Sequence, residues 1–237
     1  MTAQVSLRPP RKGPVQTENH SVPSWSWKIT MAITGIIWTA FAFIHLWGNL
    51  KVWTGADSFD SYAHWLREVG YPLVPEGFIL WAFRIVLATS LLLHVTGGFT
   101  LAFRARAARG SVRARPAAKL SRLMAVSGLI ILCFLVVHVL DLTMGVQPIA
   151  PDTFVAGSAY ANLIASLSRV PMALFYGITM LILASHILHG IKVVWTDLGS
   201  TTARWRRLSA LLALVLALVM VLGNGLIPLA VQMGWLA

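Results

Sequence analysis

The 237-residue chain contains little cysteine and little charge, and it opens without a secretory signal pattern. Its single cysteine, Cys133, lies inside an apolar run, so this chain alone can build neither a disulfide nor a thiolate-bound iron–sulfur cluster. Charged residues make up only 11% of the sequence. Residues 1–27 are polar, with no short apolar core before a small-residue cleavage site, and we expect a cytoplasmic tail. Such a low charged content, in a chain that is 57% hydrophobic, excludes an ordinary soluble domain.

Long apolar segments are what the sequence has in abundance. Hydrophobic residues account for 57% of the chain, and the mean hydropathy is +0.73. A helix needs roughly 20 apolar residues to cross the hydrocarbon core. Five stretches qualify, at about residues 29–50, 78–103, 122–145, 171–195 and 208–235. The sequence therefore predicts an all-α membrane protein whose residues 28–237 form a five-helix transmembrane bundle. Gly223-Asn224-Gly225 and Pro228 predict a kink in the last helix.

The net charge of +11 comes from basic residues placed on one side of the predicted membrane. Seven lie in residues 104–122, without an acid, and 15 of all 19 fall on the side of the N-terminus. The positive-inside rule then places the N-terminus in the cytoplasm and the C-terminus outside. This distribution argues against a nucleic-acid partner, and it favours anionic lipid headgroups or a docked soluble protein.

Four of the five apolar segments contain a histidine, and the four follow two local patterns. In the first and third segments a Thr/Ser-Gly dipeptide precedes the histidine, with ten residues from glycine to histidine: Thr34-Gly35 to His45, and Ser127-Gly128 to His138. In the second and fourth a glycine follows four residues after the histidine: His94 to Gly98, and His186 to Gly190. Ionisable residues inside a membrane normally face the bundle interior with a partner, and imidazole is a common metal ligand. Two matched pairs therefore suggest two buried metal centres, most simply two b-type haems with bis-histidine ligation.

The depths of the histidines agree with this pairing. His45 and His138 each lie 16 residues along an ascending segment, about 24 Å from the cytoplasmic side at about 1.5 Å per residue. His94 and His186 each lie 9 residues before the end of a descending segment, about 14 Å above that side. The two levels differ by about 10 Å, which is suited to a short electron path between two haems.

The four glycines have a cofactor interpretation and a packing interpretation. Gly98 and Gly190 share a helix face with the histidines four residues before them, where a missing side chain lets a flat porphyrin approach. Gly35 and Gly128 lie about 80° around the helix from their histidines, so we expect them to face the neighbouring haem or a neighbouring helix. All four are also typical of close helix packing in membranes.

These residues resemble a family, the dihaem cytochrome b membrane subunits of bacterial succinate:quinone oxidoreductases and fumarate reductases. The resemblance spans about residues 28–200 and rests on the order of the following residues: Thr34-Gly35, His45-Leu-Trp-Gly-Asn49-Leu50, Phe59-Asp-Ser-Tyr62, His94, Ser127-Gly128, His138 and His186-x-x-x-Gly190. It implies haem ligation by the first and third helices for the distal haem, and by the second and fourth for the proximal haem.

The same resemblance implies partners and a location. A flavoprotein subunit and an iron–sulfur subunit are expected on the cytoplasmic face of a bacterial cell membrane, with menaquinone as the electron acceptor and a higher oligomer allowed. One departure concerns protons. Some fumarate reductases of the family carry a glutamate two residues before the fourth-helix ligand, where this chain has Ala184. Because no acid lies in the middle of any predicted span, we expect that transmembrane proton route to be absent.

Further polar residues have weaker assignments. His189 could replace His186 as a ligand, although the His-x-x-x-Gly pattern favours His186. In a short surface helix expected at 58–68, His64 and Glu68 are candidates for a quinone site, or else solvated side chains. Candidates to hold haem propionates are Arg84 at the outer level and Lys28 or Lys192 at the inner level, unless these cations only reach toward the membrane interface.

Two other functions fit parts of the pattern. One is another haem b electron carrier, such as the quinone-linked cytochrome subunit of a different dehydrogenase. A haem-free transporter with a histidine proton relay would need no cofactor at all.

Overall fold

The structure is a computed structural model that describes residues 22–108, 116–199 and 202–237, without the side chains of 116–122. Most of the predicted polar tail and part of the basic segment 104–122 lie outside the described residues. Within them every regular element is a helix, in the order α1 (Ser24–Asn49), η1 (Leu50–Thr54), α2 (Ala56–Glu68), α3 (Phe78–Ala107), α4 (Pro116–His138), η2 (Val139–Met144), α5 (Ala159–Leu167), α6 (Val170–Asp197), α7 (Ala203–Met220), η3 (Val221–Gly225) and α8 (Leu226–Gln232).

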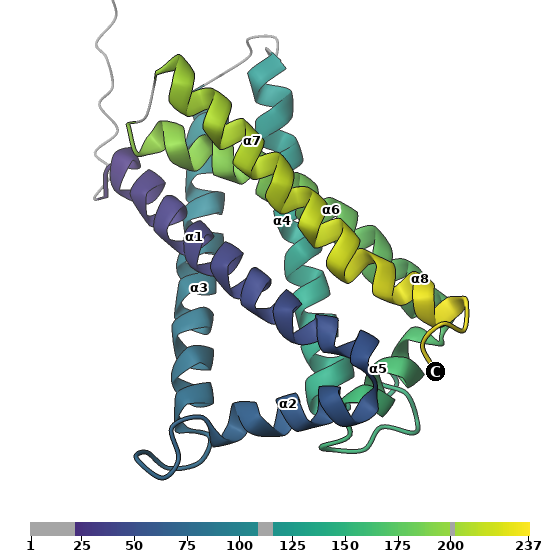
Figure 1. Cartoon of the computed structure of the whole chain (residues 1–237). Coiled ribbons are helices and arrows are strands. Elements are labelled where there is room, and N and C mark those ends of the chain that lie inside the picture. The colour runs from purple at the N-terminus through teal and green to yellow at the C-terminus, as the bar shows by residue number, and fades with distance from the viewer. Residues whose placement is uncertain (1–21, 109–115, 200–201) are drawn as a thin grey trace, which may run out of the picture.

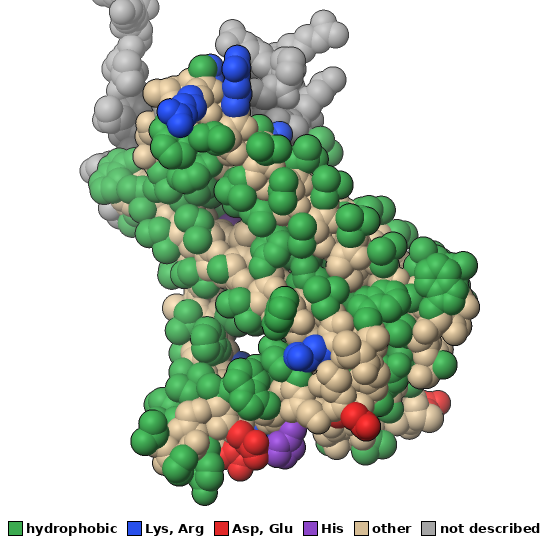
Figure 2. All heavy atoms as spheres, in the orientation of Figure 1, with side chains coloured by type: hydrophobic (Ala, Val, Ile, Leu, Met, Phe, Trp, Pro, Cys, Tyr) green, Lys and Arg blue, Asp and Glu red, His purple; other side chains and the backbone are tan. Residues whose placement is uncertain are grey.

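Among the described residues, five helical segments are long and apolar enough to cross a membrane. They are Ser24–Thr54, Phe78–Ala107, Leu123–Met144, Val170–Asp197 and Ala203–Gln232. Each contains most of one predicted span, so the predicted five-helix, multi-pass membrane protein is confirmed. Apolar side chains cover most of the visible face in Figure 2, as expected of a surface that faces lipid.

The five spans run alternately between two ends of the bundle (Figure 1). We call one end the basic end: α1 and α7 begin there, α3 and α6 end there, and Arg104, Arg106, Arg204, Arg206 and Arg207 lie there (Figure 2). The other is the α2 end, where the short helices α2 and α5 lie. The surface helix predicted at 58–68 is thus present as α2, whereas α5 was not foreseen.

The helix α6 is the centre of the bundle, because it packs against α1, α4, α7 and α8. Its buried apolar residues recur every three or four positions, which places them on one face of the helix together with the buried Thr179: Ala173, Tyr176, Met180, Ala184 and Ile187. The facing helix α7 buries small residues at the same spacing, namely Ser209, Ala213 and Ala217. Small residues let two backbones approach closely in a membrane, where lipid offers no hydrophobic driving force.

Two π-helices interrupt the spans. The last span, in which the sequence predicts a kink, contains the π-helix η3. There Gly223 lies against Leu46, and Asn224 accepts a hydrogen bond of 2.9 Å from Asn49 of α1. The second π-helix, η2, follows α4 and ends at Gly145 with a φ of 66°. A side chain at Gly145 would meet the ring of Phe154 as well as strain the left-handed backbone.

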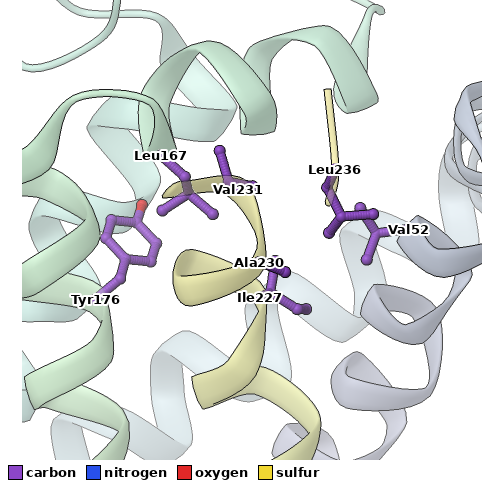
Figure 3. Packing of buried hydrophobic residues seen from close by; sticks show 7 residues of the cluster. All are labelled: Val52, Leu167, Tyr176, Ile227, Ala230, Val231 and Leu236. Atoms are coloured by element: carbon purple, nitrogen blue, oxygen red, sulfur yellow. The ribbon is translucent and has the colours of Figure 1, made fainter. Parts of the chain in front are cut away.

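A hydrophobic cluster closes the α2 end of the bundle (Figure 3). It joins residues of η1, α5, α6, α8 and the C-terminus: Val52, Leu167, Tyr176, Ile227, Ala230, Val231 and Leu236. Packing here fixes the ring of Tyr176, whose hydroxyl donates a hydrogen bond to Asp141 of η2.

Candidate metal centres between the helices

His45 of α1 and His138 of α4 face each other across the bundle. Their ring centroids are 5.8 Å apart, and the ring planes are nearly perpendicular, at 82°. A phenylalanine one helical turn earlier stacks on each ring: Phe41 on His45 at 5.6 Å and Phe134 on His138 at 5.5 Å. The repeated Phe-x-x-x-His spacing is a signal that the sequence interpretation missed, and it gives both rings the same kind of support.

His94 of α3 and His186 of α6 form the second pair, with ring centroids 6.5 Å apart and an interplanar angle of 60°. His189 lies three residues further along α6 and is half-buried, and it has no ring contact with His94 among the described residues. The structure therefore brings together the same two pairs that the depths of the spans predicted, with His186 rather than His189 beside His94.

Both separations suit one metal ion bound by both rings. An ion that binds one nitrogen of each imidazole at about 2.0–2.1 Å separates the two ring centroids by roughly 6 Å. Among the described residues no group of three or more His, Cys, Asp or Glu side chains could hold a metal ion. Each pair therefore offers two imidazole ligands to one metal centre, whose remaining ligands would come from outside the described side chains.

The hydroxyl groups of the Thr/Ser-Gly dipeptides lie within hydrogen-bond distance of the second pair, His94 and His186. Thr34 Oγ1 lies 2.9 Å from Nδ1 of His94, and Ser127 Oγ lies 2.8 Å from Nδ1 of His186. Each hydroxyl already donates its hydrogen to a backbone carbonyl of its own helix, Thr34 to Thr30 at 2.7 Å and Ser127 to Met124 at 3.0 Å. Each can therefore only accept from the histidine. The hydrogen-bond network thus assigns the proton to Nδ1 and leaves Nε2 of both rings free to bind a metal.

The glycine of each dipeptide makes room for the same ring. A Cβ atom added to Gly35 would lie 3.5 Å from Cε1 of His94, and one added to Gly128 would lie 3.5 Å from Cε1 of His186. These two glycines thus face a neighbouring helix, one of the two placements expected from the sequence. Gly98 lies 3.7 Å from Met31 of α1 by the same measure, and Gly190 borders open space. Gly98 therefore has a helix contact, and Gly190 leaves a free approach to α6.

Polar atoms without partners mark space beside the histidines. Ser90 lies one turn from His94 on α3 and is 4% exposed, yet its hydroxyl has no hydrogen-bond partner among the described residues. The indole N–H of Trp38, on α1 between Thr34 and His45, is buried and unpaired in the same way. His45 itself is accessible although it faces His138, and Figure 2 shows an opening between α3 and the rest of the bundle. A flat cofactor with polar edges fits such surroundings, since buried polar groups are normally hydrogen-bonded.

A buried carboxylate near His138 was missed by sequence reasoning. Asp141 is 0% exposed and lies in η2, three residues after His138. Its Oδ2 accepts a hydrogen bond of 2.9 Å from the hydroxyl of Tyr176, which also lies 3.3 Å from Nδ1 of His138. Asp141 lies inside the span Leu123–Met144 but three residues before its end, outside the middle part in which the sequence shows no acid. Hydropathy gave no sign that it points inward.

The other predicted site residues lie toward the two ends. Lys28 pairs with Asp197 at 3.2 Å at the basic end, where Lys192 is exposed. Arg84 lies 4.8 Å from the centre of the Trp81 ring and is exposed, at the edge of a hollow of about 270 Å³ that also includes Glu76.

The two quinone-site candidates lie together at the α2 end. His64 and Glu68 are 3.4 Å apart, and both are exposed. They line an open hollow of about 440 Å³ with Trp65 of the same helix and Gly157. Ala184, at the position where some fumarate reductases of the family carry a glutamate, lies on the buried face of α6 inside the bundle.

Residues on which the family resemblance rests make contacts between helices: α1 with α2, α2 with α5, and α1 with the last span. A Cβ atom on Gly48 would lie 2.5 Å from Cε1 of Tyr62, so α2 can approach α1 only over a glycine. Asp60 of α2 accepts a hydrogen bond of 2.8 Å from the backbone of Tyr160 in α5. Asn49 binds Asn224, as described above.

Comparison with known families agrees with this geometry. The family described as "Succinate dehydrogenase/Fumarate reductase transmembrane subunit" matches residues 104–223. The chain belongs to this family. The match includes one histidine of each pair, His138 and His186, whereas His45 and His94 precede it. No curated protein and no solved structure matches the chain.

Membership establishes the general role of this succinate dehydrogenase/fumarate reductase transmembrane subunit. It is a membrane-anchor subunit of an oxidoreductase complex, and it works with the other subunits of that complex. The family consists of cytochrome b-type membrane subunits.

Proposed function

We propose that this subunit is a dihaem cytochrome b, which carries electrons from an iron–sulfur subunit through two haems b to menaquinone. The observation that carries the proposal is the pairing of four histidines from four spans, at ring separations of 5.8 Å and 6.5 Å. A haem bound at each pair supplies reversible one-electron transfer. His45 and His138 are the proposed ligands of one haem, and His94 and His186 those of the other.

The surrounding residues orient these ligands. Thr34 and Ser127 hold the Nδ1 side of His94 and His186, which fixes the ring orientation and the tautomer of each. Partners of this kind commonly change metal affinity by 10–100-fold when they are removed. Ser90 and Trp38 have free hydrogen-bonding atoms on the same helices, suited to polar edges of a bound haem.

We further propose that the basic end faces the cytoplasm and docks the flavoprotein and iron–sulfur subunits at the plasma membrane of a bacterium. Support comes from the positive-inside rule, because the arginines of α3 and α7 gather at this end. Since α1 begins there, the N-terminus lies inside and the C-terminus outside. Lys28 and Lys192 at the same end are the proposed partners of haem propionates, and Arg84 near the other end is a third.

The α2 end is the proposed region for menaquinone. The hollow beside His64 and Glu68 is open, and it is lined by an aromatic ring and by groups that can exchange protons. It lies at the same end of the bundle as His45 and His138, so a quinone there would accept electrons from the nearer centre.

The optical spectrum of the purified complex tests the proposal. We expect the reduced-minus-oxidised difference spectrum to show a b-type α-band, with succinate as reductant and with reoxidation by a menaquinone analogue. A spectrum without this band would leave only a haem-free function. A band that dithionite reduces but succinate does not would support the subunit of a different dehydrogenase.

A further inference from the structure

The α2 end contains a cluster of charged and polar side chains. The binding of two haems does not require this cluster. Asp141 is completely buried, although moving an unpaired carboxylate out of water costs far more than one hydrogen bond returns. Three side chains compensate it. Ser166 donates to Oδ2 at 2.5 Å, Tyr176 donates to Oδ2 at 2.9 Å, and Nη2 of Arg169 donates to Oδ1 at 3.0 Å.

Only one member of the cluster reaches the surface. The side chain of Arg169 is 32% exposed, while Ser166 and Tyr176 are buried together with the carboxylate. Arg169 also precedes the first turn of α6, and its side chain binds Ser166 of α5 at 3.3 Å. The cluster therefore joins η2, α5 and α6. Joining helices alone does not explain why it contains a charge, because a buried ion pair is often no more stabilising than apolar packing.

Tyr176 connects the charge to a proposed haem ligand. Its hydroxyl hydrogen is donated to Asp141, so its oxygen can only accept the proton of Nδ1 of His138, at 3.3 Å. The direction of donation runs from His138 to Tyr176 to Asp141. A chain of hydrogen bonds that ends on an anion polarises every member toward that anion.

Among the described residues, the second pair of histidines has no hydrogen-bonded connection to a charged group. The rings of His94 and His186 bind hydroxyls that donate to backbone carbonyls, so each of these chains ends on a neutral group. The two centres thus differ in charge behind the ligand, although their ligands are the same.

We propose that Asp141, acting through Tyr176, is a positioning residue that makes His138 a more electron-donating ligand and lowers the redox potential of the His45–His138 centre. The inference rests on the proposed function. A carboxylate behind an axial histidine raises the basicity of the ligand and stabilises the oxidised metal, and such hydrogen bonding is a main way in which a protein sets a haem potential. Arg169 limits the effect by neutralising part of the charge.

Redox titration of the complete complex tests the inference with two substitutions. Asp141→Asn removes the charge with little change of shape, and Tyr176→Phe removes the link but keeps the ion pair with Arg169. Both are expected to raise the midpoint potential of the His45–His138 centre and to leave the His94–His186 centre unchanged. The centres are told apart by which one is lost in His45→Ala and which in His94→Ala. Ser127→Ala is the matched control, because Ser127 contacts His186 and the substitution should leave the midpoint potential of the His45–His138 centre unchanged.

The double variant separates the hydrogen-bonded link from a direct field. If Asp141 acts through Tyr176, Asp141→Asn shifts the potential less in a Tyr176→Phe background than in the wild type. Equal shifts in both backgrounds would overturn the role of Tyr176. If the complex with Asp141→Asn does not assemble, the Tyr176→Phe variant alone tests the inference. An unchanged midpoint potential of the His45–His138 centre in that variant overturns it. Haem content is measured in every sample: a wild-type complex without haem refutes the proposed function as well, whereas two haems with unchanged potentials in both variants refute the inference alone.

Discussion

Thr34 on α1 lies with its hydroxyl oxygen 2.9 Å from Nδ1 of His94 on α3, and Ser127 repeats this relationship to His186 at 2.8 Å. The first and third spans therefore do two things at different depths. Each provides one proposed ligand of the His45–His138 centre and one hydrogen-bond acceptor for a ligand of the other centre. This explains why the dipeptide and the histidine recur together in these two spans.

Removing either hydroxyl is expected to affect the His94–His186 centre alone. Thr34→Val and Ser127→Ala leave the Nδ1–H of a half-buried histidine without its acceptor, and leaving a buried donor unsatisfied costs about 1–3 kcal/mol. We expect a lower content of that haem or a higher midpoint potential, with the His45–His138 centre unchanged. Haem quantification and redox titration of the purified complex provide the measurement.

Thr39→Val is the matched control for Thr34→Val. Thr39 is on the same helix, and within the described part of the chain its hydroxyl bonds only to the carbonyl of Gly35, at 2.8 Å, so both haems and both potentials should be retained. An effect of Thr34→Val that Thr39→Val reproduces would show a general disturbance of α1 and contradict the assigned role.

The spans and the pairing of histidines could be predicted because both follow from position along a helix. About 1.5 Å per residue converts sequence into depth, and depth selects the partner. Depth does not show in which direction a side chain points around the helix axis, so it cannot show which neighbouring residue that side chain faces. Gly35 and His45 are about 80° apart on α1, and only the packed structure shows that Gly35 faces His94.

Asp141 was missed for a related reason. An acid near the end of an apolar span is normally solvated, and hydropathy does not report rotation. The π-helix Val139–Met144 and the helix α5, which carries Ser166, bury this side chain, and the sequence predicted neither element. The repeated Phe-x-x-x-His spacing was present in the sequence, but aromatic residues are so common in spans that it attracts no notice without the stacked rings.

Alanine substitution of single histidines is expected to separate the two centres. His45→Ala and His138→Ala should lose the same haem and keep the other, because each haem has no spare ligand from the protein. His94→Ala and His186→Ala should lose the second haem. His189→Ala should keep both, since Ser127 and His94 contact His186 and not His189.

Optical spectra and haem content of the five variants check this prediction. Loss of a haem in His189→Ala together with retention in His186→Ala would reverse the ligand assignment in α6. Loss of different haems in His45→Ala and His138→Ala would contradict the pairing.

The hydrogen bond between Asn49 and Asn224 is expected to stabilise the contact between α1 and the last span. Side-chain hydrogen bonds between helices in membranes contribute about 0.6 kcal/mol on average and at most about 1.7 kcal/mol. We expect Asn49→Leu, Asn224→Leu and the double variant to give a coupling energy within this range in a double-mutant cycle of unfolding in detergent. Strictly additive single effects would show that the two amides do not interact.

The number of haems per chain tests the central claim most directly. A pyridine haemochrome assay on the purified complex, with the chain quantified by amino-acid analysis, should give two haems b per copy of this subunit. The double variants His45→Ala/His138→Ala and His94→Ala/His186→Ala serve as internal standards and should each give one. A value of one haem or none for the wild-type chain would contradict the account.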